Sequence, residues 1–280
     1  MEPQNQARKY LVTGASGYVG GRLVRSLLNE DLEVRVFVRD KEKIKGQPWF
    51  NHVEIVEGNA NSESDLIAAL TGVHTAFYLL HSINLGKNFD DIEAVMARGF
   101  AKAAEAAGIS QIVYLGGIAN DKKSSQHLAS RVQTGTELAS GKVPVLELRA
   151  GIIIGSGSAS FEMLRHLTHR LPVMTTPKWV SNLTHPIAIR DVLYYLRNTA
   201  ILETPVNQVY DIGGPEILSY ADMMQKFAKL SGLPRRWIIK VPVLTPELSS
   251  LWIGLVTPVP TALARPLVGS LINEVVADPK

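Results

Sequence analysis

Residues 10–21 read YLVTGASGYVGG, and this stretch decides the fold. A short apolar run leads into Gly14, Gly17 and Gly20, spaced G-x-x-G-x-x-G, and apolar residues at helical spacing follow. Between a strand and a helix, such glycines permit a tight turn and let a pyrophosphate approach the free N–H groups of the helix. The stretch therefore predicts a dinucleotide-binding strand–turn–helix unit, and the alternative is a tight turn that binds no ligand.

The alternation of strand and helix patterns continues along the chain. Apolar runs predict further strands, and apolar residues spaced by three or four predict the helices between them. Strands are predicted at 33–38, 53–59, 75–80, 111–117, 143–155 and 208–214, and the later helices near 125–139, 159–170, 190–202 and 219–231. This rhythm is typical of βαβ units and of a parallel sheet with both faces covered.

We therefore predict an α/β fold, a Rossmann-type doubly wound parallel sheet with a small C-terminal substrate lobe. Residues 1–155 are expected to form the dinucleotide-binding core. Residues 156–280 are expected to supply the remainder of the sheet and the substrate-binding lobe, all within a single compact unit. After residue 234 prolines and apolar stretches alternate, which predicts a lobe that contains several apolar helical pieces.

Composition excludes several classes of protein. The 280 residues include 29 basic and 26 acidic side chains and no cysteine. This even mixture of charges argues against nucleic-acid binding, and without cysteine there is no disulfide or thiolate nucleophile. His166 and His169 stand three apart on the helix predicted at 159–170, and we expect no metal site there or elsewhere. The polar N-terminus and the proline-broken segment 248–264 predict neither a secretory signal nor a transmembrane segment, which favours a cytoplasmic location.

The end of the second predicted strand bears on the choice of dinucleotide. An acidic residue there would hold the ribose 2′-hydroxyl of NAD, whereas a guanidinium suits the 2′-phosphate of NADP. Arg39 stands at this point and Asp40 follows it. We favour NADP, with NAD as the second choice because Asp40 could take the hydroxyl.

Several motifs together resemble the atypical, extended-type short-chain dehydrogenase/reductases. They are TGASGYVGG, FVRD, EGN, YLGG and LRAGIIIGSGS, and the resemblance covers about residues 8–215. The chain is most similar to the NmrA-like and complex I accessory-subunit-like NAD(P)H-binding branch. The resemblance implies a cofactor that lies across the carboxyl ends of the strands. The implied contacts are Gly14, Ser16, Gly17, Tyr18, Val19 and Gly20 at the pyrophosphate, Arg39 at the adenosine ribose, Asn59 near the adenine, and Leu79, Leu80 and His81 toward the nicotinamide ribose.

The chain departs from that family at its catalytic positions. Catalytic members carry Ser or Thr after the fifth strand and Tyr-x-x-x-Lys on the next helix, where the Tyr passes a proton to the carbonyl. This chain has Gly116 and Gly117 at the first position, and His127 and Arg131 replace the Tyr and the Lys. The spacing of four keeps the pair on one face of a helix.

Three interpretations of this pair remain open. His127 could donate the proton while Arg131 binds the ribose, with His81 as a third catalytic participant. Alternatively, the protein could be a non-catalytic NADP(H) sensor or a scaffold for a partner protein. In the third interpretation, both side chains are simply polar residues on a solvated turn.

The C-terminal segment bears on the substrate. Apolar residues concentrate there, namely Trp237, Leu244, Leu248, Leu251, Trp252, Ile253, Leu255 and Val259. As a pocket lining they would suit a small apolar carbonyl compound better than a nucleotide sugar, whose diphosphate needs an Arg cluster. We therefore expect an oxidoreductase that acts on a small apolar molecule and disfavour an epimerase. Packing within the lobe, or a contact in a homodimer, would explain the same residues.

Overall fold

In the computed structural model, residues 8–81, 89–119, 125–241, 257 and 267–278 are described. They form one seven-stranded sheet in the order β11-β6-β5-β4-β1-β2-β3, with every neighbouring pair parallel. The strands are β1 (Lys9–Thr13), β2 (Glu33–Val38), β3 (Glu54–Glu57), β4 (Thr75–Tyr78), β5 (Gln111–Gly117), β6 (Val145–Ala150) and β11 (Gln208–Ile212). The order reverses at β1, since β2 and β4 lie on its two sides. In such sheets this is the position at which a nucleotide binds.

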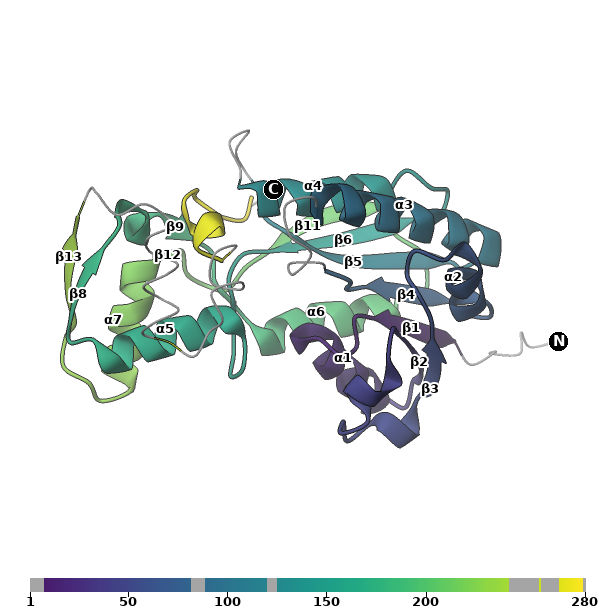
Figure 1. The fold of residues 1–280 in the computed structure, drawn as a ribbon, viewed down its shortest axis with the longest axis horizontal. Coiled ribbons are helices and arrows are strands. Elements are labelled where there is room, and N and C mark those ends of the chain that lie inside the picture. Colours follow the sequence, from purple (N-terminus) through teal and green to yellow (C-terminus); the bar gives the residue numbers. More distant parts are fainter. Residues whose placement is uncertain (1–7, 82–88, 120–124, 242–256, 258–266, 279–280) are drawn as a thin grey trace.

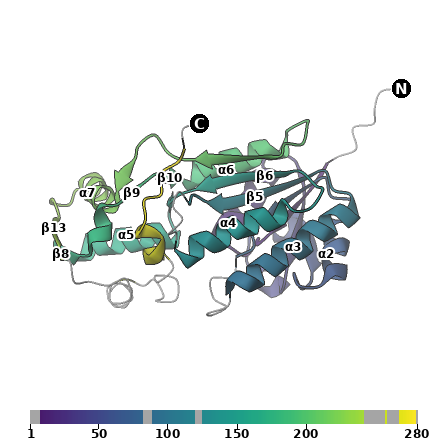
Figure 2. The same ribbon diagram turned by 90° about the horizontal axis from the view of Figure 1, so that it is seen from above.

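Helices cover both faces of the sheet (Figures 1 and 2). They are α1 (Tyr18–Leu28) and α6 (Ile189–Ala200) on one face, and α2 (Glu63–Leu70), α3 (Phe89–Ala107) and α4 (Gln126–Leu138) on the other. Leu23 and Leu27 of α1 pack with Leu196 of α6 in one apolar core, and Leu66 and Phe100 belong to the opposite core. The doubly wound sheet predicted from the sequence is confirmed.

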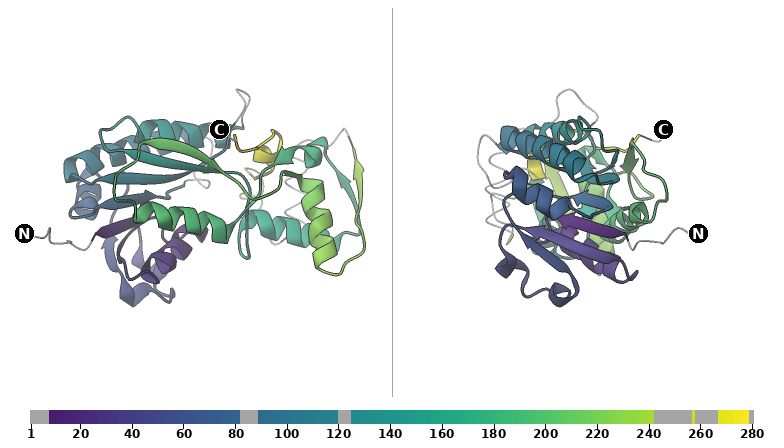
Figure 3. Two further views of the ribbon diagram at one scale, coloured as in Figure 1. Left: turned by 180° about the vertical axis from the view of Figure 1, so that it is seen from behind. Right: turned by 90° about the vertical axis from the view of Figure 1, so that its right-hand side faces the viewer.

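A smaller lobe follows the carboxyl ends of the central strands (Figure 3). It contains α5 (Ala159–Arg170), α7 (Tyr220–Leu230) and the strand pairs β7 (Ile153–Ile154) with β10 (Ile187–Ala188), β9 (Leu183–Thr184) with β12 (Leu218–Ser219), and β8 (Val173–Thr176) with β13 (Trp237–Lys240). Its core joins Met163 and Leu167 of α5 to Tyr220 and Met224 of α7. The strand β11 and the helix α6 lie after residue 156 in sequence but belong to the central sheet, which ties the two parts together.

One local prediction was wrong. The apolar run at 143–155 is two strands, β6 and β7, which pair with different partners on either side of Gly151. Residues 237–240 form a strand paired with β8, which the sequence analysis did not predict. Most of the apolar C-terminal residues named above, from Leu244 to Leu255 and Val259, lie outside the described residues. In the described part of the chain, no helix combines the length and apolar content that a membrane span requires.

Candidate functional site

The glycine loop folds tightly against the end of β4. Gly14 has a φ of +66°, and a Cβ there would lie 2.4 Å from the carbonyl oxygen of Leu79. A Cβ on Gly20 would lie 2.3 Å from the carbonyl oxygen of Gly14. Gly17 closes the turn because its N–H donates to the Gly14 carbonyl at 2.9 Å. Glycine is therefore required at Gly14 and Gly20 by the packing of the backbone.

The first turn of α1 is open to a ligand. Its N-cap, Gly17, offers no side-chain cap, whereas α2, α5 and α7 begin at serines whose hydroxyls accept an N–H from their own first turn. Ser16 and Gly17 are exposed, and the first turn of α1 carries no acidic side chain. Free N–H groups and the helix dipole favour an anion here, so this cradle fits the pyrophosphate of a dinucleotide.

The side chains of Tyr18 and Val19 pack away from this open turn. The ring of Tyr18 lies beneath the Arg22 guanidinium, with Cζ 3.9 Å from the ring centroid. Its hydroxyl is buried against Gly155, where a Cβ would come within 2.5 Å of it. Val19 packs on the core beneath α1. Both residues therefore offer a ligand their backbone more readily than their side chains.

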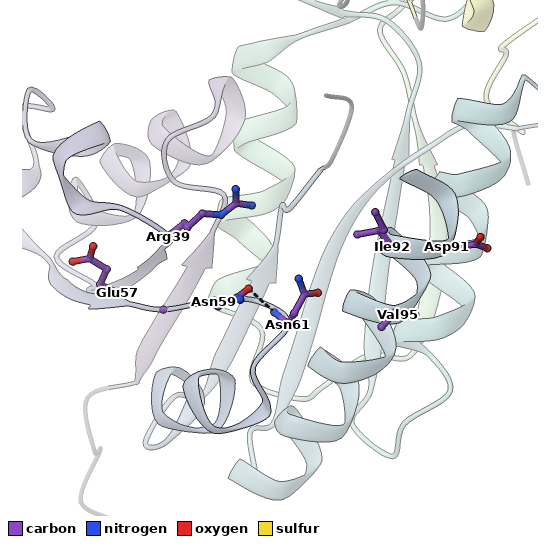
Figure 4. A pocket seen from close by; sticks show the side chains of 8 residues that line it. Arg39, Glu57, Asn59, Asn61, Asp91, Ile92 and Val95 are labelled. Carbon is purple, nitrogen blue, oxygen red and sulfur yellow. Dashed lines mark hydrogen bonds between the residues drawn. The ribbon is translucent and has the colours of Figure 1, made fainter. Parts of the chain in front are cut away.

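Arg39 and Asp40 have different surroundings at the end of β2. The Asp40 carboxylate caps the short 3₁₀ helix η1 (Lys41–Ile44) by accepting the N–H of Glu42 at 3.0 Å. Arg39 is exposed and borders a cavity of about 830 Å³. Figure 4 shows its guanidinium extended toward α3, where Ile92 faces it. The acidic neighbour is therefore engaged elsewhere, and the cation faces the cavity.

Asn59, Leu79 and Leu80 are held by their own neighbours. The Asn59 side chain accepts the N–H of Asn61 at 3.0 Å, a turn that Figure 4 also shows, and Asn59 borders the Arg39 cavity. The N–H of Leu79 donates to the Thr13 hydroxyl at 3.0 Å, which joins the ends of β4 and β1. Leu80 packs against the core on the α3 side. Asn59, the predicted adenine contact, and Leu79 and Leu80, predicted to lie toward the nicotinamide ribose, thus lie at the same edge of the sheet as the glycine loop.

A second cavity, of about 210 Å³, lies at the ends of β5 and β6 beneath the lobe. Most of its lining is apolar, including Leu115, Ile152, Ile153, Met163 and Leu271. Three predicted catalytic residues, His81, His127 and Arg131, border it together. Since β1 lies between β4 and β2 in the sheet, the glycine loop stands between this cavity and the Arg39 cavity.

Helix α4 positions His127 and Arg131. The helix begins after Ser125, whose hydroxyl accepts the N–H of Leu128 at 3.3 Å. The Arg131 guanidinium donates to the carbonyl oxygen of Leu115 on β5. The hydroxyl of Tyr114 in turn donates to the carbonyl of Arg131 at 3.0 Å. These bonds fix His127 and Arg131 over the end of β5. Both residues border the cavity, and His127 Nδ1 is buried. The interpretation of the pair as polar residues on a solvated turn therefore does not fit this structure.

His81 bonds to Glu93, which in turn bonds to Ser130, and the sequence analysis missed both of these residues. Its Nδ1 lies 2.7 Å from Oε1 of Glu93, and Oε2 of Glu93 accepts the Ser130 hydroxyl at 2.5 Å. The His81 and His127 rings lie 4.9 Å apart, centroid to centroid. The sequence does contain a signal that could have identified Glu93. It shares a helix face with the buried residues Ala97 and Phe100, and a carboxylate buried there needs a hydrogen-bonding partner.

Burial sets the protonation of the two histidines. Burial, with the positive charge that His81 would carry and that of Arg131, lowers the pKa of His127 to about 3. Burial also lowers the pKa of His81, and the hydrogen bond that His81 donates to Glu93 acts against that shift. His127 is therefore neutral at pH 7, where its ring offers one donor and one acceptor.

Other polar groups border the second cavity or lie near it. The Thr184 and Tyr220 hydroxyls border it, are buried and have no hydrogen-bond partner among the described residues, and burial raises the pKa of Tyr220. His185, in contrast, serves the fold, because its Nε2 bonds to the Gly214 carbonyl at 2.6 Å.

Of the two glycines at the position where the resembled family carries serine, Gly116 has a steric reason. Gly116 and Gly117 both border the second cavity. A Cβ on Gly116 would lie 2.6 Å from Oε1 of the buried Glu147, and one on Gly135 of α4 would lie 2.4 Å from Oε2 of the same carboxylate. Glu147 pairs with Arg149 at 2.8 Å. Its carboxylate therefore fills the space between β5 and α4 that larger residues would need.

Comparisons with known proteins agree with this geometry. Residues 14–139 match a family model described as NAD(P)H-binding. The photosystem II assembly factor Ycf39 of Cyanophora paradoxa is 26% identical over 253 residues, which cover 85% of this chain and 73% of that protein.

Two solved structures share the fold. The Citrobacter sp. triphenylmethane reductase complexed with NADP(H) has a TM-score of 0.74 at 20% identity and covers 95% of this chain and 91% of its own. The NADPH-dependent quinone oxidoreductase QOR2 of Escherichia coli, complexed with NADPH, has a TM-score of 0.74 at 20% identity, with coverage of 94% and 88%. Residues 14–139 are therefore similar to NAD(P)H-binding domains, and the chain shares the fold of these two NADP(H)-bound reductases.

Proposed function

We propose that this chain is an NADP(H)-dependent oxidoreductase that reduces a small apolar carbonyl compound. The observation that carries the proposal is the cavity at the ends of β5 and β6, which is mainly apolar yet bordered by His81, His127 and Arg131. A largely apolar pocket with a few convergent polar groups is typical of a small-molecule site. The glycine loop lies between this cavity and Arg39. A dinucleotide bound at Arg39 and at the glycine loop would therefore extend toward the cavity.

The choice of NADP rests on Arg39 and Asp40. A 2′-phosphate needs a cation, and Arg39 borders the larger cavity with an exposed guanidinium. NAD selection needs a carboxylate free to bind the 2′-hydroxyl. The Asp40 carboxylate already accepts the Glu42 N–H, so its bond to a ribose would compete with this cap.

The reduced nicotinamide would supply a hydride to the carbonyl carbon. His127 is neutral at pH 7 and serves as an N–H donor that polarises the carbonyl oxygen. Arg131, anchored on the Leu115 carbonyl, supplies positive charge beside it. The donation of a full proton by His127, which the sequence suggested, would require a much higher pKa in the ligand-bound state.

The substrate class follows from the size and lining of the second cavity. A volume of about 210 Å³ fits a small ring system, and its mostly apolar walls would exclude a nucleotide sugar. Quinone reduction, the reaction in the name of the Escherichia coli neighbour, falls within this class. We therefore propose quinones and related unsaturated carbonyl compounds as the first substrates to try.

The test uses NADPH deuterated at C4, prepared separately for each face, with the purified protein and a panel of small ketones, enones and quinones. For the ketones and enones, mass spectrometry should show one deuterium on carbon, transferred from one face only; for the quinones, whose quinol products do not retain the label, the quinol itself is measured. His127→Phe should suppress the reaction while the affinity for NADPH stays unchanged. Tight NADPH binding without any deuterated product or quinol would contradict the proposal.

That last outcome would support a second function, a non-catalytic NADP(H) sensor. The observation that favours it is the combination of Gly116 at the serine position with a His127 that is neutral at pH 7. A sensor should bind NADPH and NADP⁺ with clearly different affinities, which calorimetry measures directly.

A further inference from the structure

We propose that Glu93 and His81 form the proton-transfer pair of this site, with His81 Nε2 as the atom that exchanges a proton with the ligand oxygen. The proposal rests on the oxidoreductase function proposed above and names the residue that carries the proton. Glu93 is the positioning residue, since it acts through His81.

Glu93 is a buried carboxylate aimed at His81. Its residue exposure is 5%, and Oε1 lies 2.7 Å from His81 Nδ1. Oε2 accepts the hydroxyl of Ser130 from the neighbouring helix α4. A buried charge is retained when it is hydrogen-bonded on several sides, so α3 and α4 together hold this carboxylate in place.

The Glu93 carboxylate fixes the tautomer of His81. An ionised carboxylate only accepts hydrogen bonds, so the 2.7 Å contact requires a proton on His81 Nδ1. In the neutral ring, Nε2 then carries the lone pair. That nitrogen is buried and has no hydrogen-bond partner among the described residues, and His81 borders the apolar cavity.

His127 lacks this support. Its Nδ1 is buried with no partner in the described part of the chain, and no described carboxylate lies within ion-pair distance of its ring. Among the described residues, the charged groups around His81 are Glu93 on α3 and Arg131 on α4. Glu93 favours the imidazolium form of His81, and Arg131 disfavours that form. The ring of His127, also on α4, lies beside the His81 ring. Of the two rings, His81 is therefore the better proton carrier.

His81 gains and loses one proton in each turnover. In reduction, the neutral ring first takes up a proton from solvent at Nε2, and the Glu93 carboxylate stabilises the resulting imidazolium. Hydride then adds to the carbonyl carbon, the C=O π pair moves to the oxygen, and the oxygen takes that proton from Nε2. His81 is left neutral, with Nδ1–H still donated to Glu93. In the reverse direction, neutral Nε2 removes the hydroxyl proton while the C–H pair leaves as hydride. The carboxylate stabilises the charged ring in both directions, as in catalytic triads.

The first experiment observes the histidine rings of the ligand-free protein by ¹⁵N NMR, with His81 assigned from a His81→Asn variant. At pH 7 we expect the Nδ1–H tautomer for His81. In Glu93→Gln the titration midpoint of His81 should move downward, because the charge that stabilises the imidazolium is lost. Glu137→Gln removes a carboxylate at the C-terminal end of α4, where it pairs with Arg98 at 2.6 Å, and it should leave the midpoint unchanged.

An Nε2–H tautomer in the wild type, or an unchanged midpoint in Glu93→Gln, would overturn the pair. If Glu93→Gln does not fold, the wild-type tautomer alone decides. In the deuterium assay, Glu93→Gln should lower kcat by about 10²-fold or more at similar KM, the usual range for a lost proton-transfer group. Wild-type kcat in this variant overturns the pair but not the oxidoreductase, whereas no product from the wild type overturns the oxidoreductase and the proton transfer with it.

Discussion

The rings of His81 and His127 lie 4.9 Å apart, and of these two rings only that of His81 bonds to a carboxylate of the described residues. The two histidines come from different elements, one from the end of β4 and the other from the first turn of α4. They share a cavity but differ in the charge that surrounds them. Their separate responses to pH are the basis of the first prediction.

We predict an acid-dependent loss of stability that originates at His127. Its folded pKa of about 3 lies below the ordinary value of 6.5, so above pH 6.5 the ring is neutral in both states and stability does not depend on its titration. As the pH falls below 6.5, His127 becomes protonated in the unfolded chain but stays neutral in the folded chain. Stability should fall by up to about 1.4 kcal/mol per pH unit from this group. Urea unfolding at pH 6.5 and 5.0 measures the loss, about 2 kcal/mol.

His127→Phe should reduce that acid-dependent loss by a similar amount. His52→Phe is the matched control, because His52 is an exposed histidine and its removal should leave the pH dependence unchanged. Equal pH dependence in the wild type and His127→Phe would contradict the buried neutral state of His127.

Arg39→Ala should weaken NADPH binding selectively. If Arg39 bonds the 2′-phosphate, the loss of one or two charge-assisted hydrogen bonds should cost about 1.5–3 kcal/mol, roughly 10- to 150-fold in Kd. NADH, which lacks that phosphate, should bind almost as before. Calorimetry with both cofactors measures the difference, and Arg25→Ala, which removes an exposed cation at the end of α1, serves as control. An equal loss for NADPH and NADH would place Arg39 away from the 2′-phosphate.

Gly14→Ala should destabilise the fold and abolish cofactor binding. The residue has a φ of +66°, and the new Cβ would meet the Leu79 carbonyl oxygen at 2.4 Å. Strained backbone of this kind costs about 1–3 kcal/mol before the clash is included. Gly46→Ala is the control, since nothing lies within 4 Å of a Cβ there. Thermal unfolding should separate the two variants by several degrees, and equal melting temperatures would refute the steric account.

Gly116 and Gly117 should tolerate serine very differently. A Cβ on Gly116 meets the Glu147 carboxylate at 2.6 Å, whereas one on Gly117 finds its nearest neighbour, a Leu128 methyl, at 3.3 Å. We expect Gly116→Ser to lose about 1–3 kcal/mol, the usual cost of overpacking, and Gly117→Ser to lose much less. Denaturant unfolding of both variants makes the comparison. A Gly116→Ser protein as stable as the wild type would mean that Glu147 can move aside.

Much of the fold was predictable because its signals are local. Two local signals indicate a parallel sheet: the glycine spacing after residue 13 and the continuous apolar runs of the inner strands. Neither signal depends on which residues contact one another in the folded sheet. A weaker local signal failed at 143–155, where one apolar run contains the two strands β6 and β7.

The candidate site was predictable only in part, because it depends on long-range pairing. His81 and His127 were each identifiable as candidates, but their proximity follows from the order of the strands, which brings the end of β4 beside α4. Glu93 lies 12 residues from His81 on another element. To predict the role of Glu93, one would have to know which face of α3 packs toward the sheet.

The carboxylate of Glu147 also bears on how this protein could change over time. It occupies the space beside both Gly116 and Gly135, so the three positions are coupled through one buried side chain. A serine at position 116 displaces the Glu147 carboxylate, because Oε1 is the atom that the new Cβ would meet. That displacement disturbs the ion pair between Glu147 and Arg149. A lineage that regained the conventional serine would therefore adjust its core at Glu147 and Arg149 together with the cavity wall.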